Sequence, residues 1–173
     1  MSKKEPRTKE LIREYLLNEG LLREKLPDPQ SKLEFGFIFS FPPGQETQRM
    51  SVFKPKDKNF IIIILRTQIS ESHVNSLKTG KNDKISSFLS DLRKYFIIKE
   101  VYFRIDIQNF RYEISDQLYL EKSGYISKNL FFNSIRKLFY SYMYSNIILE
   151  EKLSGKLKIS DKNISKFDLS LYS

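Results

Sequence analysis

The chain alternates apolar side chains with other side chains over Leu33-Glu-Phe-Gly-Phe-Ile-Phe-Ser-Phe41, where every odd-numbered position is Leu or Phe. Successive side chains of a β-strand point to opposite faces of a sheet, so this stretch predicts a strand with one strongly apolar face. Pro42-Pro43-Gly44 ends the strand, and residues 50–54 return as a second, shorter strand. The pattern therefore predicts an antiparallel sheet that buries one face against other elements.

A third strand is predicted where four consecutive Ile residues follow Phe60. Because residues 60–65 leave no polar face, we expect this strand to be covered on both sides and central in the sheet. Farther along, apolar and polar residues alternate over residues 101–107, and residues 111–120 follow after a short turn. These two segments predict a hairpin that adds two more strands.

Apolar residues recur at helical spacing in the segments that flank the predicted strands. The first helix has Thr8 as its N-cap and Gly20 as its stop, and one or two shorter helices follow between Ser70 and Phe96. Ser127 begins a long terminal helix that reaches about Lys152. The predicted order is helix, three strands, one or two helices, two strands and a long C-terminal helix, which is an α+β fold with helices packed on an antiparallel sheet. We expect one domain over residues 1–152 and a basic C-terminal tail over residues 153–173.

The composition removes many kinds of active site. The 173 residues include no Cys, no Trp and one His, which excludes disulfides, thiolate zinc sites and cysteine nucleophiles. His73, the only imidazole, follows a predicted helix start, where a structural role or simple exposure is the ordinary explanation. Asp106 and Glu113 resemble paired catalytic carboxylates, but Arg104 and Arg111 beside them favour cross-strand ion pairs. We therefore expect no enzymatic activity, no cofactor and no metal.

The N-terminal residues are charged and contain no apolar segment of signal-peptide length, so we expect a cytoplasmic protein. Residues 130–149 have the length of a membrane span, but Arg136 and Lys137 lie at their centre beside Asn133 and Ser134. We therefore expect no membrane partner.

The terminal helix carries two neighbouring apolar stripes, although a helix that covers one sheet needs only one. One stripe contains Ile135, Leu138 and Leu149, and the second lies beside it. The extra apolar surface predicts a symmetric homodimer, with an interface that contains Phe131, Phe132, Phe139, Met143 and Ile147. The alternative is that a large twisted sheet wraps the helix and buries both stripes within one copy of the chain.

The chain is basic, with 30 Lys and Arg against 21 Asp and Glu and a net charge of +9. Such an excess favours polyanions as partners, although an AT-rich coding sequence also accounts for part of it. The cations gather at both ends, around the second strand and in the terminal helix, where residues 122–149 contain no Asp or Glu. Because each phosphate contact releases counterions and the contacts accumulate, these groups predict an RNA-binding surface. It comprises Lys3, Lys4, Arg7, Lys9, Arg49, Lys54, Lys56, Lys58, Lys128, Arg136, Lys137, Lys156, Lys158, Lys162 and Lys166.

Four stretches stand out along the chain: residues 26–29 (Leu-Pro-Asp-Pro), 54–64 (Lys-Pro-Lys-Asp-Lys-Asn-Phe-Ile-Ile-Ile-Ile), 69–77 (Ile-Ser-Glu-Ser-His-Val-Asn-Ser-Leu) and 88–93 (Phe-Leu-Ser-Asp-Leu-Arg). Together with the element order, they resemble a largely archaeal family of uncharacterised cytosolic proteins over residues 10–152. Members of that family look like type III secretion chaperones in fold. The resemblance implies a non-enzymatic scaffold that forms homodimers and binds other macromolecules, as secretion chaperones use this fold to hold extended peptides.

The leading prediction is a non-enzymatic, dimeric factor that binds structured RNA by phosphate contacts, on a ribosomal particle as an associated factor of the dormancy or dimerisation type. The alternative is a chaperone-like homodimer that binds a peptide or protein along its sheet or its Phe-rich strand edge. Salt separates the two predictions, because RNA binding weakens steeply with ionic strength whereas binding in apolar pockets survives it.

Overall fold

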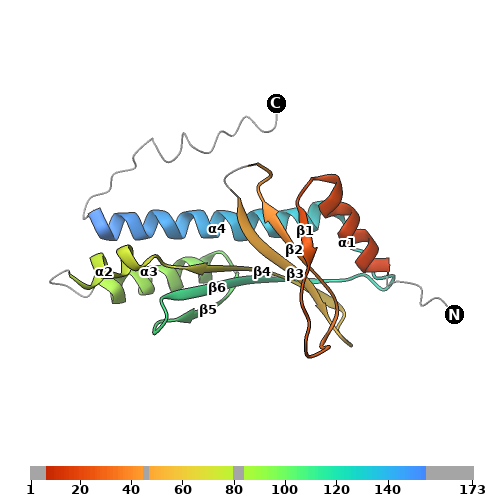
Figure 1. Cartoon of the computed structure of the whole chain (residues 1–173), viewed down its shortest axis with the longest axis horizontal. Coiled ribbons are helices and arrows are strands. Elements are labelled where there is room, and N and C mark those ends of the chain that lie inside the picture. Colours follow the sequence, from red (N-terminus) through yellow and green to blue (C-terminus); the bar gives the residue numbers. More distant parts are fainter. Residues whose placement is uncertain (1–6, 45–46, 80–83, 155–173) are drawn as a thin grey trace.

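The structure, a computed structural model, describes residues 7–44, 47–79 and 84–154. Figure 1 shows a sheet with a long helix running along one side and shorter helices at the two ends. In chain order the elements are α1 (Arg7–Asn18), β1 (Leu22–Lys25), β2 (Leu33–Phe41), β3 (Gln48–Pro55), β4 (Phe60–Gln68), α2 (Glu71–Lys78), α3 (Lys84–Ile98), β5 (Tyr102–Asp106), β6 (Arg111–Tyr119) and α4 (Lys128–Ser154).

All strand pairs of the sheet are antiparallel, and the strand order is β1-β2-β3-β4-β6-β5. The Phe-rich stretch forms β2 with the predicted bounds, and β4 lies between β3 and β6, so its central position is confirmed. β5 and β6 form the predicted hairpin, in which Asp106 lies opposite Arg111. The α+β class and the antiparallel sheet are therefore confirmed.

The predicted element order is wrong at one place, because the sheet has a further strand, β1, at its edge. β1 has four residues, and only Leu22 among them is partly buried, so it shows no alternation of apolar and polar positions. Its place is set by pairing with β2, where Leu22 lies opposite Phe39 and Lys25 opposite Phe37. The Phe-rich strand is consequently an inner strand of the sheet and not an edge.

Thr8 does not cap α1, as its position in the sequence predicted, but lies inside the first turn. Its side chain is buried, and Thr8 Oγ1 donates a hydrogen bond of 2.7 Å to the carbonyl oxygen of Gly124 in the loop before α4. Gly124 has a φ of +73°, and a Cβ at this position would lie 2.8 Å from Thr8 Oγ1. Glycine at position 124 therefore permits the close contact that holds the start of α1 against this loop.

The core lies between the sheet and the helices. α4 packs on β4 and β6 and against α2 and α3, whereas α1 packs on β1 and β2. Wholly buried side chains come from helices and strands alike, among them Ile12, Phe39, Ile63, Phe96 and Phe131. Each large apolar side chain buried in this way stabilises the fold by about 1.5–3 kcal/mol. Because α4 runs along the length of the sheet (Figure 1), it joins the packing at the two ends of the molecule.

Most of the predicted interface residues of the terminal helix are already buried in a single copy of the chain. Phe131, Phe132 and Phe139 are buried, whereas Met143 is half-buried and Ile147 is 40% exposed. This burial agrees with the alternative in which the sheet wraps both stripes. The homodimer stays a prediction, and the part of α4 left for it is an outer face that contains Tyr140, Met143, Tyr144 and Ile147. Among the described residues, no helix is both long enough and apolar enough to cross a bilayer.

Candidate nucleic-acid interface

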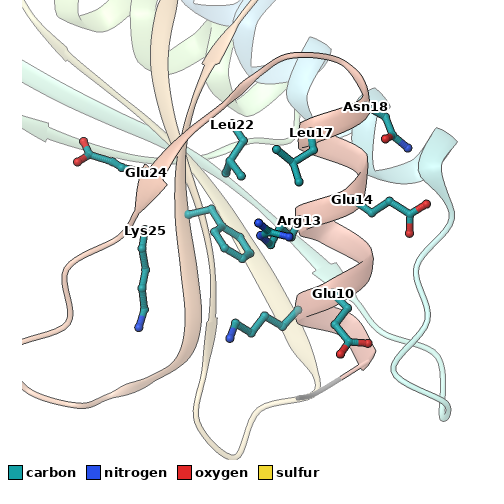
Figure 2. Close-up of a pocket in the computed structure, with 10 residues that line it drawn as sticks. Glu10, Arg13, Glu14, Leu17, Asn18, Leu22, Glu24 and Lys25 are labelled. Carbon is teal, nitrogen blue, oxygen red and sulfur yellow. The ribbon is translucent and has the colours of Figure 1, made fainter. Parts of the chain in front are cut away.

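A groove of about 620 Å³ lies between α1 and the edge strand β1 (Figure 2). Two rows of side chains form its helical wall, since residues four apart lie on the same side of a helix. One row is Lys9, Arg13 and Leu17, and the next is Glu10, Glu14 and Asn18. In Figure 2, Arg13 and Leu17 point toward β1, whereas the second row points away from it. The helix therefore turns a cation and an apolar side chain toward the strand and keeps its acids outside.

The other lining of the groove comes from β1 and β2. Leu22, which is half-buried, and Phe37, which is buried, line it together with Leu17, which is 47% exposed. Glu24 points away from α1 in Figure 2 and forms an ion pair with Arg49 of β3. The groove thus combines an apolar lining with a cation whose neighbouring carboxylates point elsewhere.

Lys25 lines the groove. Further exposed lysines lie in and beside the chain turns next to this end of the groove. We define the lysine cluster as Lys25, Lys32, Lys56 and Lys58, all of which are exposed. The loop before β2 and the turn after β3 meet there, because the Lys56 backbone N–H donates a 3.0 Å hydrogen bond to the Lys32 carbonyl oxygen. Two turns far apart in the sequence therefore place their lysines side by side.

The Asp28 carboxylate lies among these lysines and is held by the backbone. It accepts hydrogen bonds from the backbone N–H groups of Leu33 at 2.8 Å and of Lys32 at 3.0 Å. The Leu33 bond is the main cause of a lowered Asp28 pKa, and the charges of Lys56 and Lys25 lower the pKa further. The effect of these two charges places Lys56 and Lys25 near the Asp28 carboxylate.

A model of one protein family matches most of the chain. The family is described as "Uncharacterized conserved protein (DUF2299)", and the match covers residues 8–149. The chain belongs to this family. The matched part of the DUF2299 chain includes the groove, the lysine cluster and most of α4. No curated protein matches the chain.

The DUF2299 chain is also similar to a solved structure, the crystal structure of an uncharacterized protein from Methanothermobacter thermautotrophicus. The two chains share 22% sequence identity with a TM-score of 0.73, and the match covers 84% of this chain and 99% of that one. At this identity the likeness shows a shared fold and does not extend to function. The expected likeness to an archaeal protein is confirmed in this sense, whereas the likeness to secretion chaperones stays a prediction.

Acids from other elements pair with the cations predicted on the terminal helix of this DUF2299 chain. Lys137 Nζ lies 2.8 Å from Asp116 Oδ2 of β6. Lys128 Nζ lies 2.5 Å from Glu19 Oε1, just after α1. The helix segment that has no acids of its own is therefore partly neutralised in space, and less of its charge is available to a partner.

Other predicted cations are also occupied. Lys54, whose side chain is 12% exposed, forms an ion pair with Glu34, and Arg136 donates a hydrogen bond to the Asn133 side chain. By contrast, six cations on α1, in the groove and in the lysine cluster have no ion-pair partner among the described residues, as is also true of dispersed cations elsewhere such as Arg23, Arg93 and Arg104. The six cations are Arg7, Arg13, Lys25, Lys32, Lys56 and Lys58. These side chains lie on α1 beside the groove, within the groove and in the lysine cluster.

Three cations of this surface were missed by the sequence analysis, namely Arg13, Lys25 and Lys32. The spacing of Arg13, four residues after Lys9, was a usable signal, as was the placing of two lysines on either side of the turn at residues 27–29. The predicted cations Lys3, Lys4, Lys156, Lys158, Lys162 and Lys166 lie outside the described residues. Gly80, which the sequence favours as the end of the first shorter helix, and Asp83, which it favours as the cap of the next, lie outside them too.

The described residues hold no group of three or more His, Asp or Glu side chains arranged to bind a metal ion. Asp106 forms an ion pair with Arg111 at 2.9 Å, as expected. Glu113 pairs with Arg66 of β4 at 2.6 Å, where Arg104 had been the expected partner. Both carboxylates are thus engaged in cross-strand ion pairs.

Proposed function

We propose that this protein is a non-enzymatic cytoplasmic factor that binds structured RNA, with the groove and the lysine cluster as its docking surface. One observation carries the proposal. Elsewhere in the described part of the chain, predicted cations such as Lys54, Lys128 and Lys137 are paired with carboxylates. At the groove and the lysine cluster, exposed cations gather without ion-pair partners among the described residues.

The chemistry of this surface suits phosphate contacts. Exposed lysines and arginines release counterions from nucleic acid when each meets a phosphate, and about six such contacts give binding that depends steeply on salt. The apolar lining of the groove gives an unpaired base a face beside those contacts. RNA helices are recognised mainly by shape and by backbone contacts, so the surface requires no base-reading motif. We propose a ribosomal particle as the first candidate source of this RNA.

The test compares two variants of the full chain that lose equal charge. One variant changes Lys25, Lys32 and Lys56 to Gln, and the matched control changes the exposed Lys94, Lys99 and Lys122 to Gln. Fluorescence anisotropy with a labelled RNA hairpin measures affinity at about 50 mM salt, where three lost phosphate contacts should weaken binding by about tenfold or more. The control variant should bind within about threefold of the unchanged chain, because its lysines lie outside the docking surface.

Equal losses in the two variants contradict docking at the lysine cluster. If the unchanged chain binds neither the hairpin nor purified ribosomal particles at low salt, the proposal of RNA binding is wrong.

A second candidate function is a chaperone-like homodimer that holds a peptide, with a fold of the type III secretion chaperone kind. The observation that favours it is β1, which is an edge strand of the sheet and also lines the groove. An extended peptide adds to such an edge through main-chain hydrogen bonds and fills side-chain sites beside it. Binding of this kind should persist at about 1 M salt, where phosphate contacts are lost.

A further inference from the structure

A second cavity, of about 310 Å³, lies where α2, α3 and α4 meet strands β4 and β6. In Figure 1 this region lies at the opposite end of the molecule from α1 and β1. Binding sites for small molecules in proteins commonly begin at about 300 Å³. The cavity is therefore large enough for a small ligand and is separate from the groove and the lysine cluster.

A chain of hydrogen bonds lines one wall of this cavity. The Ser145 hydroxyl donates its single hydrogen to the Tyr142 carbonyl oxygen at 2.6 Å. The Tyr112 hydroxyl must therefore be the donor in its own hydrogen bond with Ser145 Oγ. Burial raises the pKa of Tyr112 to about 12, so this hydroxyl stays protonated at neutral pH. Its oxygen keeps the capacity to accept a hydrogen bond from a ligand.

Thr67 adds a second buried hydroxyl, which faces that of Tyr112. Its Oγ1 is buried and makes no hydrogen bond of normal geometry with any described residue. The Thr67 hydroxyl is close enough to the Tyr112 hydroxyl to lower the Tyr112 pKa, and so it offsets part of the rise that burial causes. Buried polar atoms in proteins are nearly always paired, so the Thr67 hydroxyl is a group that a ligand can satisfy.

The remaining lining supplies aromatic side chains and further polar groups. Phe88 and Tyr142 bring aromatic rings in addition to Tyr112. His73, which is exposed, and Asn146, which is half-buried, can each donate and accept hydrogen bonds. No Lys or Arg is among the described residues that line the cavity, although the chain has 30 of them, and the exposed Glu150 is the one acidic residue of the lining.

We propose that this cavity binds a small, uncharged, flat heterocycle of the nucleoside class. The half-buried Tyr142 ring gives such a ligand an apolar surface to pack on, and Thr67, Asn146 and His73 give its edges donors and acceptors. A phosphate group gains little here, because its strong partners are Arg and Lys. The proposal does not rest on RNA binding, since the docking surface for RNA lies at the other end of the molecule.

The experiment titrates adenosine into the full chain and follows the imidazole signals by NMR. The chain has one His, so every imidazole signal reports on His73 at the cavity. Asn146→Phe fills the cavity with a ring, and Asn133→Phe places the same ring on the exposed side of α4 as the matched control. We expect a saturable shift that Asn146→Phe weakens by about tenfold or more and that Asn133→Phe leaves within about twofold.

Two further measurements keep the proposal open to refutation if Asn146→Phe disturbs the fold. Thr67→Val keeps the shape of the side chain and removes its hydroxyl, so it should weaken adenosine binding by about tenfold while the far-UV circular dichroism stays unchanged. Adenosine 5′-monophosphate should bind more weakly than adenosine. A shift that never saturates, equal affinity in Asn146→Phe and the unchanged chain, or tighter binding of the monophosphate overturns the proposal. If the chain binds adenosine but does not bind RNA, the proposed RNA-binding function is overturned and the proposal for this cavity stands.

Discussion

Lys137→Met should destabilise the fold, because Lys137 forms a partly buried ion pair whose carboxylate is largely shielded from water. Its Nζ lies 2.8 Å from Asp116 Oδ2, and the side chains of Lys137 and Asp116 are 35% and 11% exposed. Removing one partner of a fully buried pair costs about 3–5 kcal/mol, whereas a surface pair is worth about 0–1 kcal/mol. The Ser134 hydroxyl still donates to the same carboxylate oxygen at 2.8 Å and offsets part of the loss. We therefore expect the free energy of unfolding to fall by about 2 kcal/mol.

Urea unfolding followed by circular dichroism measures this change in free energy. In thermal unfolding, the Tm should fall by about 4–8 °C for a chain of this size. The matched control is Lys128→Met, whose pair with Glu19 is exposed, at 47% and 45% of the two side chains. The control should cost at most about 0.5 kcal/mol. In a chain that already carries Asp116→Asn, Lys137→Met should cost less than about 1 kcal/mol, because no buried charge is left unpaired.

Equal stabilities of Lys137→Met and the unchanged chain would refute the view that Lys137 neutralises a buried Asp116. RNA affinity provides the second criterion, because the docking surface proposed above does not include Lys137. Lys137→Met should therefore keep RNA affinity within about twofold. A large loss of RNA affinity with unchanged stability would indicate that Lys137 contacts RNA, as the sequence predicted.

Three further predictions concern a glycine, a tyrosine and the outer face of α4. Gly124→Ala should lower the free energy of unfolding in urea by about 2 kcal/mol, because its Cβ would lie 2.8 Å from Thr8 Oγ1 at a φ of +73°. Gly20→Ala, at a φ of +67° with no atom within 4 Å, should cost only about 1 kcal/mol, and equal costs would contradict the clash. The Tyr112 pKa is raised from 10.0 to about 12, so its contribution to stability is complete below pH 10 and is lost as the pH rises toward 12. Tyr112→Phe should remove this part of the alkaline loss in pH-dependent unfolding, and an unchanged loss would argue against it. Ile147→Glu should convert a homodimer to a monomer in light scattering, and a monomeric mass for the unchanged chain contradicts the homodimer.

Long apolar patterns explain which elements the sequence predicts. β2 and β4 bury long runs of apolar residues, and α4 buries one side of a long segment, so the apolar runs of the strands and the period of about 3.6 residues of the helix are visible in the sequence. β1 has no such pattern, since three of its four side chains are exposed. Its position depends on pairing with β2, which comes later in the chain, and local sequence does not encode that pairing. Thr8 was assigned to a cap for a similar reason, because its partner Gly124 is 116 residues away.

The candidate site shows the same division between local and distant information. The sequence predicts which residues are cations but not which of them an acid neutralises. Lys128 and its partner Glu19 are 109 residues apart, so residues 122–149, which contain no Asp or Glu, give no sign of the acid that neutralises Lys128. Arg13 and Lys25 line one groove only because β1 lies beside α1, and the strand that brings them together was itself not predicted.

The edge strand β1 has a consequence for the behaviour of the chain at high concentration. An uncovered edge of a Phe-rich strand is a template on which other chains assemble, and natural proteins protect such edges with short, charged or irregular strands. β1 has all three properties: four residues, three exposed charged side chains (Arg23, Glu24 and Lys25), and a shift in register between Leu22 and Glu24. β1 covers part of the edge of β2, and its own outer edge is too short, charged and irregular to favour repeated strand pairing between copies of this chain. These few residues are therefore a safeguard against aggregation as well as one wall of a groove.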